Sequence, residues 1–382
     1  MNISDSERAA SVLERAGYEM TSKINEADLI VVVMCSVRQS AVDRVHYLAH
    51  KFKKLKTTNC KLQTILTGCI LKKDKKTFEK SFDYIVDINE AKNLAKIARQ
   101  QALLTSRSRA GRCPSEARAS EARISKASEA LAERAGQQSL LPSGYIPIMT
   151  GCNNFCSYCV VPYTRGREIS RPVKEIINDV KTALKNGVKK ICLLGQNVNS
   201  FNGHRTLRGI AFGSNRANMT IKFPELLKLV DDIPGNFVLN FTTSHPKDFS
   251  DELVNTMIKC KKFSKMLNLP IQSGDDNVLK RMNRPYTVAQ YKSLVKKIRK
   301  AIPDIKLSTD VIVGFPGETK KQFENTVKTL KEIGFGVAFI NKYSPRPGTA
   351  AAKMKDDVPW PEKKRREKIL IKLVNNKKGA SK

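Results

Sequence analysis

The chain has 382 residues, enough for two or three domains with a sizeable core. Its 69 Lys and Arg outnumber its 36 Asp and Glu and give a formal net charge of +33, which favours a polyanionic partner, although a Lys-rich surface alone also produces it. The longest apolar run, 29–35, is far below the roughly 20 residues of a membrane-spanning helix, and residues 1–15 carry charges throughout. We therefore expect no membrane segment and no secretion signal.

The cysteine content indicates a reducing compartment. Nine cysteines, an odd number, stand in a chain without a secretory pattern, so a disulfide framework is disfavoured and a cytoplasmic location is expected. Reduced thiols remain available as metal ligands.

Residues 1–103 alternate between amphipathic stretches and short apolar runs. Such alternation predicts parallel strands with crossover helices, and hence an amino-terminal, doubly wound α/β domain. The expected helices and strands, in chain order, are 5–16 (helix), 28–34 (strand), 39–55 (helix), 61–67 (strand), 82–88 (strand) and 90–101 (helix).

Residues 104–142 interrupt this pattern. Their degenerate repeat of Ala, Ser, Glu and Arg has almost no large apolar side chain to bury, so we interpret the segment as an inserted low-complexity linker. Cys113 lies within it and is expected to be a spare thiol.

Residues 143–360 resume the alternation with a longer rhythm, which predicts a full or partial β/α barrel. A basic helical tail over 361–382 follows. The expected strands are 145–150, 190–194, 237–242, 266–271, 306–313 and 337–343, and the expected helices are 173–186, 224–232, 251–261, 288–301 and 321–333.

Each expected barrel strand ends in a polar cluster. The clusters are GCNNFCSYC, GQNVNS, TSHP, QSGDD, GFPGET and SPRPGT. Barrel active sites are built at the carboxyl ends of the strands, so these clusters should converge on one mouth.

The motif that carries chemistry is CxxxCxxC, formed by Cys152, Cys156 and Cys159. Three thiolates on one loop can hold three irons of a 4Fe–4S cluster, and the open fourth iron can bind the amino and carboxylate groups of S-adenosylmethionine. A structural zinc site is the alternative, but it usually takes four protein ligands, and the next candidates are the more distant Cys192 and His204.

The stretches CNNFCSYCVVPYTRGREISRP, LLGQNVNSF, FTTSHPKD, LPIQSGDDNVLKRMNR, STDVIVGFPGET and YSPRPGTAA resemble those of radical SAM methylthiotransferases. The chain is most similar to the branch that adds a 2-methylthio group to N6-isopentenyladenosine next to the tRNA anticodon. The resemblance implies a transferase that uses S-adenosylmethionine and a 4Fe–4S cluster. Related branches act on threonylcarbamoyladenosine or on a ribosomal protein, and both remain alternatives.

Within this resemblance, Cys152, Cys156 and Cys159 would be the catalytic cluster ligands. Residues at the other strand ends would contact S-adenosylmethionine, with Asp310 reaching a ribose hydroxyl and small residues admitting the adenine. His245, at the end of the third expected strand, could also contact the nucleotide, but it could equally serve only to cap that strand end. The expected cofactor-binding residues are Gly195, Gln196, Asn197, Ser244, Gln272, Ser273, Asp310 and Gly314.

Family members carry a second 4Fe–4S cluster that is tied to sulfur donation. Cys35 and Cys69 match two of its three ligands, and the third would stand just upstream of Met1, on a first strand that this chain lacks. Cys60 cannot replace it, because nine extended residues separate it from Cys69 by about 30 Å. The number of clusters, one or two, stays open, as does the reading of Cys35 and Cys69 as ordinary buried thiols.

The expected partners are a tRNA anticodon stem-loop and an electron donor such as flavodoxin or ferredoxin, with the chain acting as a monomer. Arg165, Arg167 and Arg171 follow the cluster motif and would meet RNA phosphate or pair with acidic neighbours such as Glu168. The small RNA-binding β-barrel that ends family members is not expected after Arg365. A truncated, inactive protein that only binds RNA is therefore the alternative to an enzyme.

Overall fold

The computed structural model describes residues 2–36, 39–59, 61–87, 90, 94, 144–206 and 218–379. The chain divides into two compact units, Met1–Pro142 and Ser143–Lys382. Cys60, Cys113, the linker predicted over 104–142 and most of the helix predicted over 90–101 lie outside the described residues.

The first unit is built on a parallel sheet whose described strands have the order β1-β2-β3. β1 (Leu29–Cys35) and β2 (Gln63–Cys69) pair along their whole length, as their apolar runs predict. β3 (Tyr84–Ile85) is shorter than predicted. The Asp83 carboxylate accepts hydrogen bonds from the backbone and hydroxyl of Thr64, and the Asp83 amide donates to Thr64 O at 3.1 Å, so side-chain contacts add to backbone pairing just before β3.

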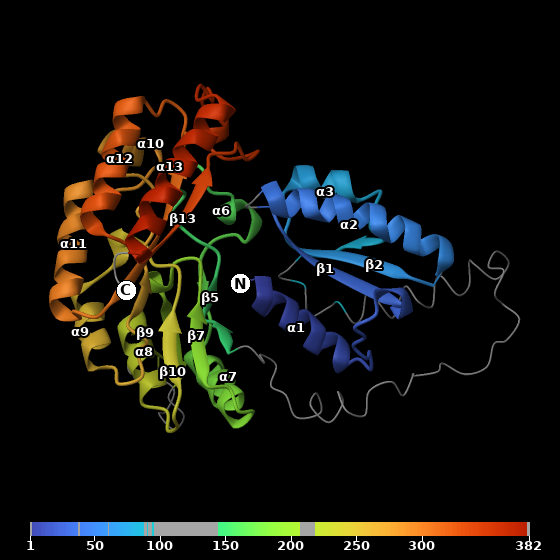
Figure 1. Cartoon of the computed structure of the whole chain (residues 1–382). Coiled ribbons are helices and arrows are strands. Elements are labelled where there is room, and N and C mark those ends of the chain that lie inside the picture. The colour runs from blue at the N-terminus through green and yellow to red at the C-terminus, as the bar shows by residue number, and fades with distance from the viewer. Residues whose placement is uncertain are drawn as a thin grey trace, which may run out of the picture. The chain divides into compact units, whose positions relative to one another are not determined.

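Helices cover both faces of this sheet (Figure 1). Phe52 of α2 packs in one apolar cluster with Leu66, whereas Leu13 of α1 packs in another with Ile65. Since successive strand residues point to opposite faces, α1 and α2 lie on opposite sides of β2, and the doubly wound prediction is confirmed. The helices are α1 (Asn2–Glu14), α2 (Gln39–Thr58) and α3 (Lys72–Phe78), with a 3₁₀ turn at Ile24–Glu26.

The second unit contains a series of parallel strands that neighbour one another in chain order. Among the described residues, β4, β7 and β10 form one sheet and β11, β12 and β13 another, and a parallel bridge from Leu239 to Phe263 joins the two. This arrangement is a partial β/α barrel, as predicted. The strands are β4 (Tyr145–Pro147), β7 (Lys190–Leu194), β10 (Val238–Phe241), β11 (Met266–Asn268), β12 (Lys306–Val313) and β13 (Val337–Lys342).

The helices of the second unit lie outside its strands (Figure 1). Local sequence sets their ends: Thr287 with Gln290, and Thr319 with Gln322, form capping boxes at the starts of α11 and α12. The helices that correspond to predicted ones are α7 (Val173–Lys185), α8 (Phe223–Asp231), α9 (Asp251–Lys259), α11 (Val288–Ala301) and α12 (Lys320–Ile333).

The sequence did not predict several smaller elements of this unit. They are β6 (Ile169–Ser170), α6 (Val161–Thr164), the hairpin of β8 (Asn202–Thr206) and β9 (Asn218–Lys222), α10 (Asp276–Arg281), and 3₁₀ turns at Val198–Ser200, Pro246–Asp248 and Ala351–Lys353. β5 (Met149–Thr150), which pairs with β6, lies within the strand predicted over 145–150, which the structure divides into β4 and β5.

The basic carboxyl-terminal helix α13 (Trp360–Gly379) packs against the barrel. Leu370 of this helix is fully buried. Two of its basic residues are also buried, Lys363 at 2% and Arg366 at 4% exposure. Arg366 Nη1 lies 2.7 Å from a carboxylate oxygen of the buried Glu318. Among helices of the described residues, none has both the length and the apolar character needed to cross a bilayer.

Candidate functional site

The CxxxCxxC loop begins at a backbone position that requires glycine. Gly151 follows β5 with a φ of +79°, and a Cβ there would meet the carbonyl oxygen of Arg167 at 2.0 Å. Cys152 comes next, and its amide donates to Gly166 O, on the same neighbouring segment as Arg167. Glycine therefore lets the chain turn sharply from the strand into the cysteine loop.

The end of α10 and the residues directly after it support this loop. Ser157 donates through its amide to Met282 O (3.0 Å) and through its hydroxyl to Arg281 O (2.8 Å). Asn283 Nδ2 donates to Phe155 O at 2.9 Å. Segments distant in sequence thus hold the cysteine loop in one shape.

α10 ends in a Schellman motif that presents these supporting groups. Asn283 adopts a left-handed φ of +55°, its amide donates to Lys280 O, and the amide of Arg284 donates to Leu279 O. The chain reverses there, which turns Asn283 and Arg284 toward the cysteine loop. The RMNR sequence at 281–284 contains the residues of this helix end, but cysteine spacing alone did not indicate that they contact the cysteine loop.

The three thiols interact electrostatically. Burial is the main cause that raises the pKa of Cys159 to about 12, and the Cys156 and Cys152 thiolates raise it further. Burial, then Cys156 and Glu168, likewise raise the pKa of Cys152. No three His, Cys, Asp or Glu side chains of the described residues converge as ligands of a single ion. Ligands on separate corner irons of a cluster stand farther apart than ligands on one ion.

Buried polar atoms without hydrogen-bond partners gather at the ends of β7 and β10. These two strand ends adjoin, since Val198 N donates to Thr243 O at 3.1 Å and Asn197 Nδ2 donates to Asp248 at 2.7 Å. Buried unpaired polar atoms are rare and call for a ligand or water. Within the described residues the unpaired atoms here are Gln196 Oε1, Asn197 Oδ1, Asn199 Oδ1 and Nδ2, Ser244 Oγ and His245 Nε2.

His245 presents a neutral donor. Its Nδ1 accepts the amide of Lys247 at 3.3 Å, so the expected capping role is present and the proton of the neutral ring belongs on Nε2. Burial, helped by the Arg284 and Lys247 charges, lowers the pKa of His245 to about 2. Nε2–H is thus a buried donor available to a ligand.

Glu168 connects the cysteine loop to the β7 end. Its amide donates to the Asn153 side chain at 3.2 Å, and its carboxylate accepts the Ser200 hydroxyl at 2.8 Å. Burial and then the neighbouring Asp248 raise the pKa of Glu168, whereas Ser200 lowers it. The thiols and the unpaired polar atoms therefore belong to one continuous region, and sequence reasoning missed both Glu168 and Asn199 as part of it.

Gln272 and Asp310 lie together beyond β11. Gln272 N donates to Asp310 O at 2.9 Å, and Asn268 Nδ2 donates to the Asp310 carboxylate at 3.2 Å. Gln272 has a left-handed φ of +69°, which is unusual for a non-glycine residue and is held here by pairing with β12. Both are on the β11–β12 side of the barrel.

Three other expected contact residues pack against other parts of the barrel unit. Ser273 is fully buried, with its hydroxyl 3.4 Å from Thr326 of α12 and accepting the Asp275 amide. The space that a side chain at Gly314 would take is filled by the Lys363 methylenes, the nearest 2.4 Å from an ideal Cβ. Gly195 is likewise packed against the Met149 side chain. Local packing thus accounts for these positions without an adenine.

The three arginines after the motif have different surroundings. Arg165 is buried. Arg171 donates to Pro147 O and pairs with Asp179 at 2.9 Å, so it has a structural role. Arg167 is exposed, and its guanidinium lies 4.5 Å from the Phe155 ring centroid. Of the three, only Arg167 combines exposure with an aromatic neighbour.

In the first unit, Cys35 and Cys69 occupy the last positions of β1 and β2 and are register partners. Gly68 precedes Cys69 with a φ of +113°, and a Cβ there would meet Met34 O at 2.2 Å. Thr67 is buried with an unpaired hydroxyl in the part of the chain that is described. Both thiols therefore lie at one sheet edge, at the carboxyl ends of their strands.

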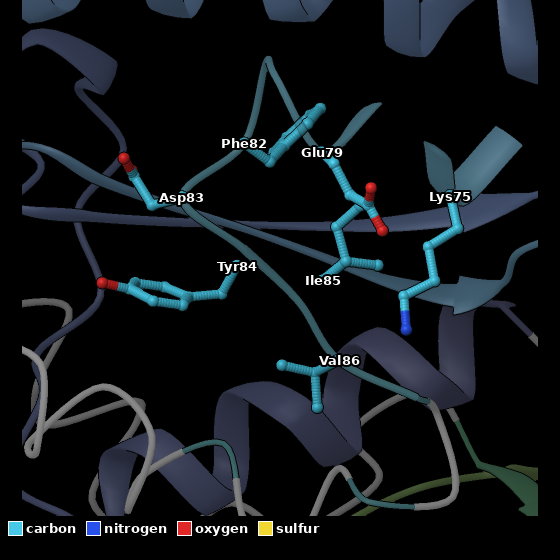
Figure 2. Close-up of a pocket in the computed structure, with 7 residues that line it drawn as sticks. All are labelled: Lys75, Glu79, Phe82, Asp83, Tyr84, Ile85 and Val86. Atoms are coloured by element: carbon cyan, nitrogen blue, oxygen red, sulfur yellow. The ribbon is translucent and has the colours of Figure 1, made fainter. Parts of the chain in front are cut away.

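A cavity of about 350 Å³ lies elsewhere in this unit, around β3 (Figure 2). Lys75 of α3 and Glu79 directly after it line one side, and Asp83, which also lines the cavity, is held by Lys56 and Thr64. No cysteine lines it, so this cavity is separate from the thiol pair.

Two family models match the chain. The Radical SAM superfamily matches residues 146–330, and the uncharacterized protein family UPF0004 matches residues 1–88. The first spans the cysteine motif and most of the barrel, and the second covers the doubly wound unit.

Similar proteins of named function cover nearly the whole chain. A tRNA-2-methylthio-N(6)-dimethylallyladenosine synthase of Enterobacter sp. (strain 638) is 39% identical over 98% of this chain and 75% of its own length. The synthase of Clostridium novyi (strain NT) is 38% identical, with 98% and 79% covered. That of Neisseria gonorrhoeae (strain NCCP11945) is 37% identical, with 98% and 81% covered.

Solved structures share the fold. The radical S-adenosylmethionine methyltransferase TsrM from Kitasatospora setae, solved with cobalamin and a [4Fe-4S] cluster, has a TM-score of 0.56 at 14% identity, covering 91% of this chain and 73% of its own. The cobalamin-dependent S-adenosylmethionine radical enzyme OxsB has a TM-score of 0.53 at 11% identity, covering 99% and 53%.

Proposed function

Since the chain belongs to the family of tRNA-2-methylthio-N(6)-dimethylallyladenosine synthases, we propose that it adds a 2-methylthio group to N6-isopentenyladenosine next to the tRNA anticodon. The observation that carries the proposal is the supported loop with Cys152, Cys156 and Cys159 beside the buried unpaired polar atoms of the β7 and β10 ends.

This region fits a 4Fe–4S cluster with S-adenosylmethionine. Three thiolates are the donors such a cluster takes, and the unpaired amide, hydroxyl and imidazole atoms suit the methionyl end of the nucleotide. Cys152, Cys156 and Cys159 would hold the cluster, with Gln196, Asn197 and Ser244 around the methionyl group. When bound, these groups supply the one-electron cleavage chemistry of the radical SAM family.

The protein's own contribution is orientation. Neutral His245 donates from Nε2 without introducing a charge, because its low pKa keeps the ring unprotonated at any working pH. Glu168 and Asp248 place carboxylates near Cys152 and Asn197, where they would attract the cationic ammonium and sulfonium of S-adenosylmethionine. Asp310, held by Asn268, would accept a hydrogen bond from a ribose hydroxyl.

Cys35 and Cys69 are proposed to serve the sulfur-donating half through a second cluster. Register pairing at neighbouring strand ends supports a shared ligand set, and Gly68 supplies the positive φ and the space beside Met34 O that bring Cys69 to the strand end. Two thiols leave a cluster short of its usual ligands, so the number of clusters is a direct readout of this part of the proposal.

Phe155 and Arg167, with Tyr163 of α6, form a partly exposed stacking surface beside the cysteine loop that supports contact with unpaired RNA bases. Phe155 and Tyr163 pack edge to face at 6.1 Å, Tyr163 is 54% exposed, and Arg167 covers Phe155. Loop bases of RNA are typically held by aromatic rings and guanidinium planes. An electron donor such as flavodoxin or ferredoxin, a cytoplasmic setting and a monomeric state complete the proposal.

The test uses a bacterial strain that lacks its own synthase. Expression of the full chain should restore 2-methylthio-N6-isopentenyladenosine, measured by mass spectrometry of tRNA nucleosides, and the Cys152→Ala variant should not restore it. The reconstituted chain should release 5′-deoxyadenosine from S-adenosylmethionine under reducing, anaerobic conditions.

Other outcomes identify the alternatives. A methylthio group on threonylcarbamoyladenosine or on a ribosomal protein would move the chain to a related branch. A protein that binds tRNA but takes up no iron and releases no 5′-deoxyadenosine would be a binding remnant and would contradict the proposal.

A further inference from the structure

Arg284 is a buried cation with no carboxylate among its hydrogen-bond partners in the described residues. Arg284 is only 6% exposed. Nη2 donates to Pro270 O at 2.8 Å and Nε donates to the Tyr286 hydroxyl at 2.8 Å. Neither partner is charged, and no carboxylate of the described residues lies within ion-pair distance of the guanidinium.

The remaining partner is a sulfur atom of the cysteine motif. Arg284 Nη1 lies 3.6 Å from Cys156 Sγ, within hydrogen-bond reach for sulfur. Asp276, a carboxylate that lines the 480 Å³ cavity next to Arg284, accepts the Val288 amide instead. The sulfur of Cys156, which would be a thiolate when it binds iron, is therefore the group that this cation faces.

An unpaired buried charge is costly, so buried arginines are normally matched by an anion. Arginine stays protonated under all ordinary conditions, and the mismatch cannot be relieved by loss of a proton. A thiolate-bound iron–sulfur cluster carries the negative charge that is otherwise missing beside Arg284.

We propose that Arg284 is a positioning residue for the iron–sulfur cluster, which it orients through Cys156 and whose reduced form it stabilises. The inference rests on the proposed cluster at Cys152, Cys156 and Cys159. A hydrogen bond to a cluster sulfur and a nearby positive charge both favour the state that has gained an electron, so both raise the reduction potential.

Arg284 also links the cysteine loop to the segment that follows β11. Its contact with Pro270 O, together with the Tyr286 hydroxyl donating to Ile271 O at 2.9 Å, ties Cys156 to the backbone that leads to Gln272. The same side chain thus connects the cluster ligand to the barrel side that carries Asp310.

The experiment measures the midpoint potential of the barrel cluster by an EPR-monitored redox titration of the full, reconstituted chain. The background carries Cys35→Ala and Cys69→Ala, so that a second cluster does not contribute. Arg284→Gln should lower the reduced fraction at a fixed potential by about tenfold or more, which corresponds to about 59 mV for a one-electron couple. Arg284→Lys, which keeps the charge, should shift less.

Arg299→Gln is the matched control, since Arg299 also donates to backbone carbonyls, those of Ile333 and Gly334, but touches no sulfur. An Arg284→Gln protein with full iron and an unchanged potential would overturn the inference. If Arg284→Gln fails to assemble a cluster, Arg284→Lys decides: a cluster near the unsubstituted potential supports the role of charge, and loss of the cluster contradicts it. Absence of a cluster in the unsubstituted background would instead refute the proposed function.

Discussion

The two cysteine sites of the chain differ in how their thiols are held. In the barrel unit, Cys152, Cys156 and Cys159 lie on one loop that side chains and backbone of residues 281–284 support. In the first unit, Cys35 and Cys69 come from two strands and meet because the strands are paired in register. A glycine with positive φ directly precedes a cysteine in both, Gly151 and Gly68.

The difference concerns which structure must form first. Sequence spacing brings the loop thiols together, and the barrel only refines their arrangement. The strand thiols have no local relationship, and their proximity depends entirely on the register of β1 and β2. The first site should therefore respond to changes in its supporting contacts, and the second to changes in the sheet.

Removal of a loop thiol should have the largest effect. Cys152→Ala, Cys156→Ala or Cys159→Ala should each reduce 5′-deoxyadenosine release by about 10³-fold or more, because the cluster carries the chemistry. Iron analysis should show a loss of about four irons per chain. Cys192→Ala, which removes a half-buried thiol of β7, is the control and should keep both.

Removal of Cys35 or Cys69 should separate the two halves of the reaction. S-Adenosylmethionine cleavage should stay within about twofold of the unsubstituted chain, because these thiols belong to the other unit. The methylthiolated nucleoside should disappear from tRNA digests. If cleavage falls as steeply as in Cys152→Ala, the assignment of separate roles is wrong.

The two glycines can be compared by matched substitutions. Gly151→Ala and Gly68→Ala should each destabilise by about 2–4 kcal/mol, from left-handed strain plus a backbone clash. Gly166→Ala and Gly17→Ala, which share positive φ but have no atom within 4 Å of an ideal Cβ, should lose only about 1 kcal/mol. Urea unfolding midpoints provide the measurement. Equal losses of stability in Gly151→Ala and Gly166→Ala, or in Gly68→Ala and Gly17→Ala, would show that small shifts relieve the clash.

His245 should make the barrel unit sensitive to acid. The pKa of its buried ring is about 2, far below the unfolded value near 6.5, so below pH 6.5 the unfolded state binds the extra proton and stability falls as pH decreases. Between pH 7.5 and 5 this single group should cost about 2 kcal/mol. His245→Asn, which can still cap Lys247 N, should lose this dependence in unfolding measurements at both pH values. An unchanged dependence would place the sensitivity at another group.

Arg167 should have the smallest effect, on RNA binding alone. Arg167→Ala should weaken binding of an anticodon stem-loop by about fivefold and reduce the salt dependence by about one ion. Lys300→Ala, an exposed cation on α11, is the control in a fluorescence anisotropy titration at several salt concentrations. A matching loss in both variants would indicate a diffuse charge effect.

The strand and helix pattern was predictable because period and length are local properties. α11 matches its predicted range, and β12 does as well, since capping residues and apolar alternation mark their ends. The β8–β9 hairpin and α10 were missed, because neither has a strong periodic pattern. β3 was overpredicted: it covers only Tyr84–Ile85 of the predicted range 82–88, although the flanking amides of Asp83 and Val86 still donate to β2 carbonyls.

The site was only partly predictable, for a physical reason. Spacing reveals ligands that share one loop, but not their supports, and Arg284 lies 128 positions from Cys156. Arg167 and Arg171 look equivalent in sequence, yet only Arg171 reaches Asp179. Gly314 was expected to leave room for a ligand, whereas Lys363, from a helix interpreted as a tail, fills that room.

The long-range support of the cysteine loop has a consequence for maturation of the nascent chain. Ser157 donates to Arg281 O, 124 positions later, so the loop cannot gain its final shape until the intervening strands have left the ribosome and folded. At typical translation rates that delay is on the order of 10 s. The thiols are therefore made well before their supporting contacts exist, and under the proposed function iron delivery would follow completion of the barrel.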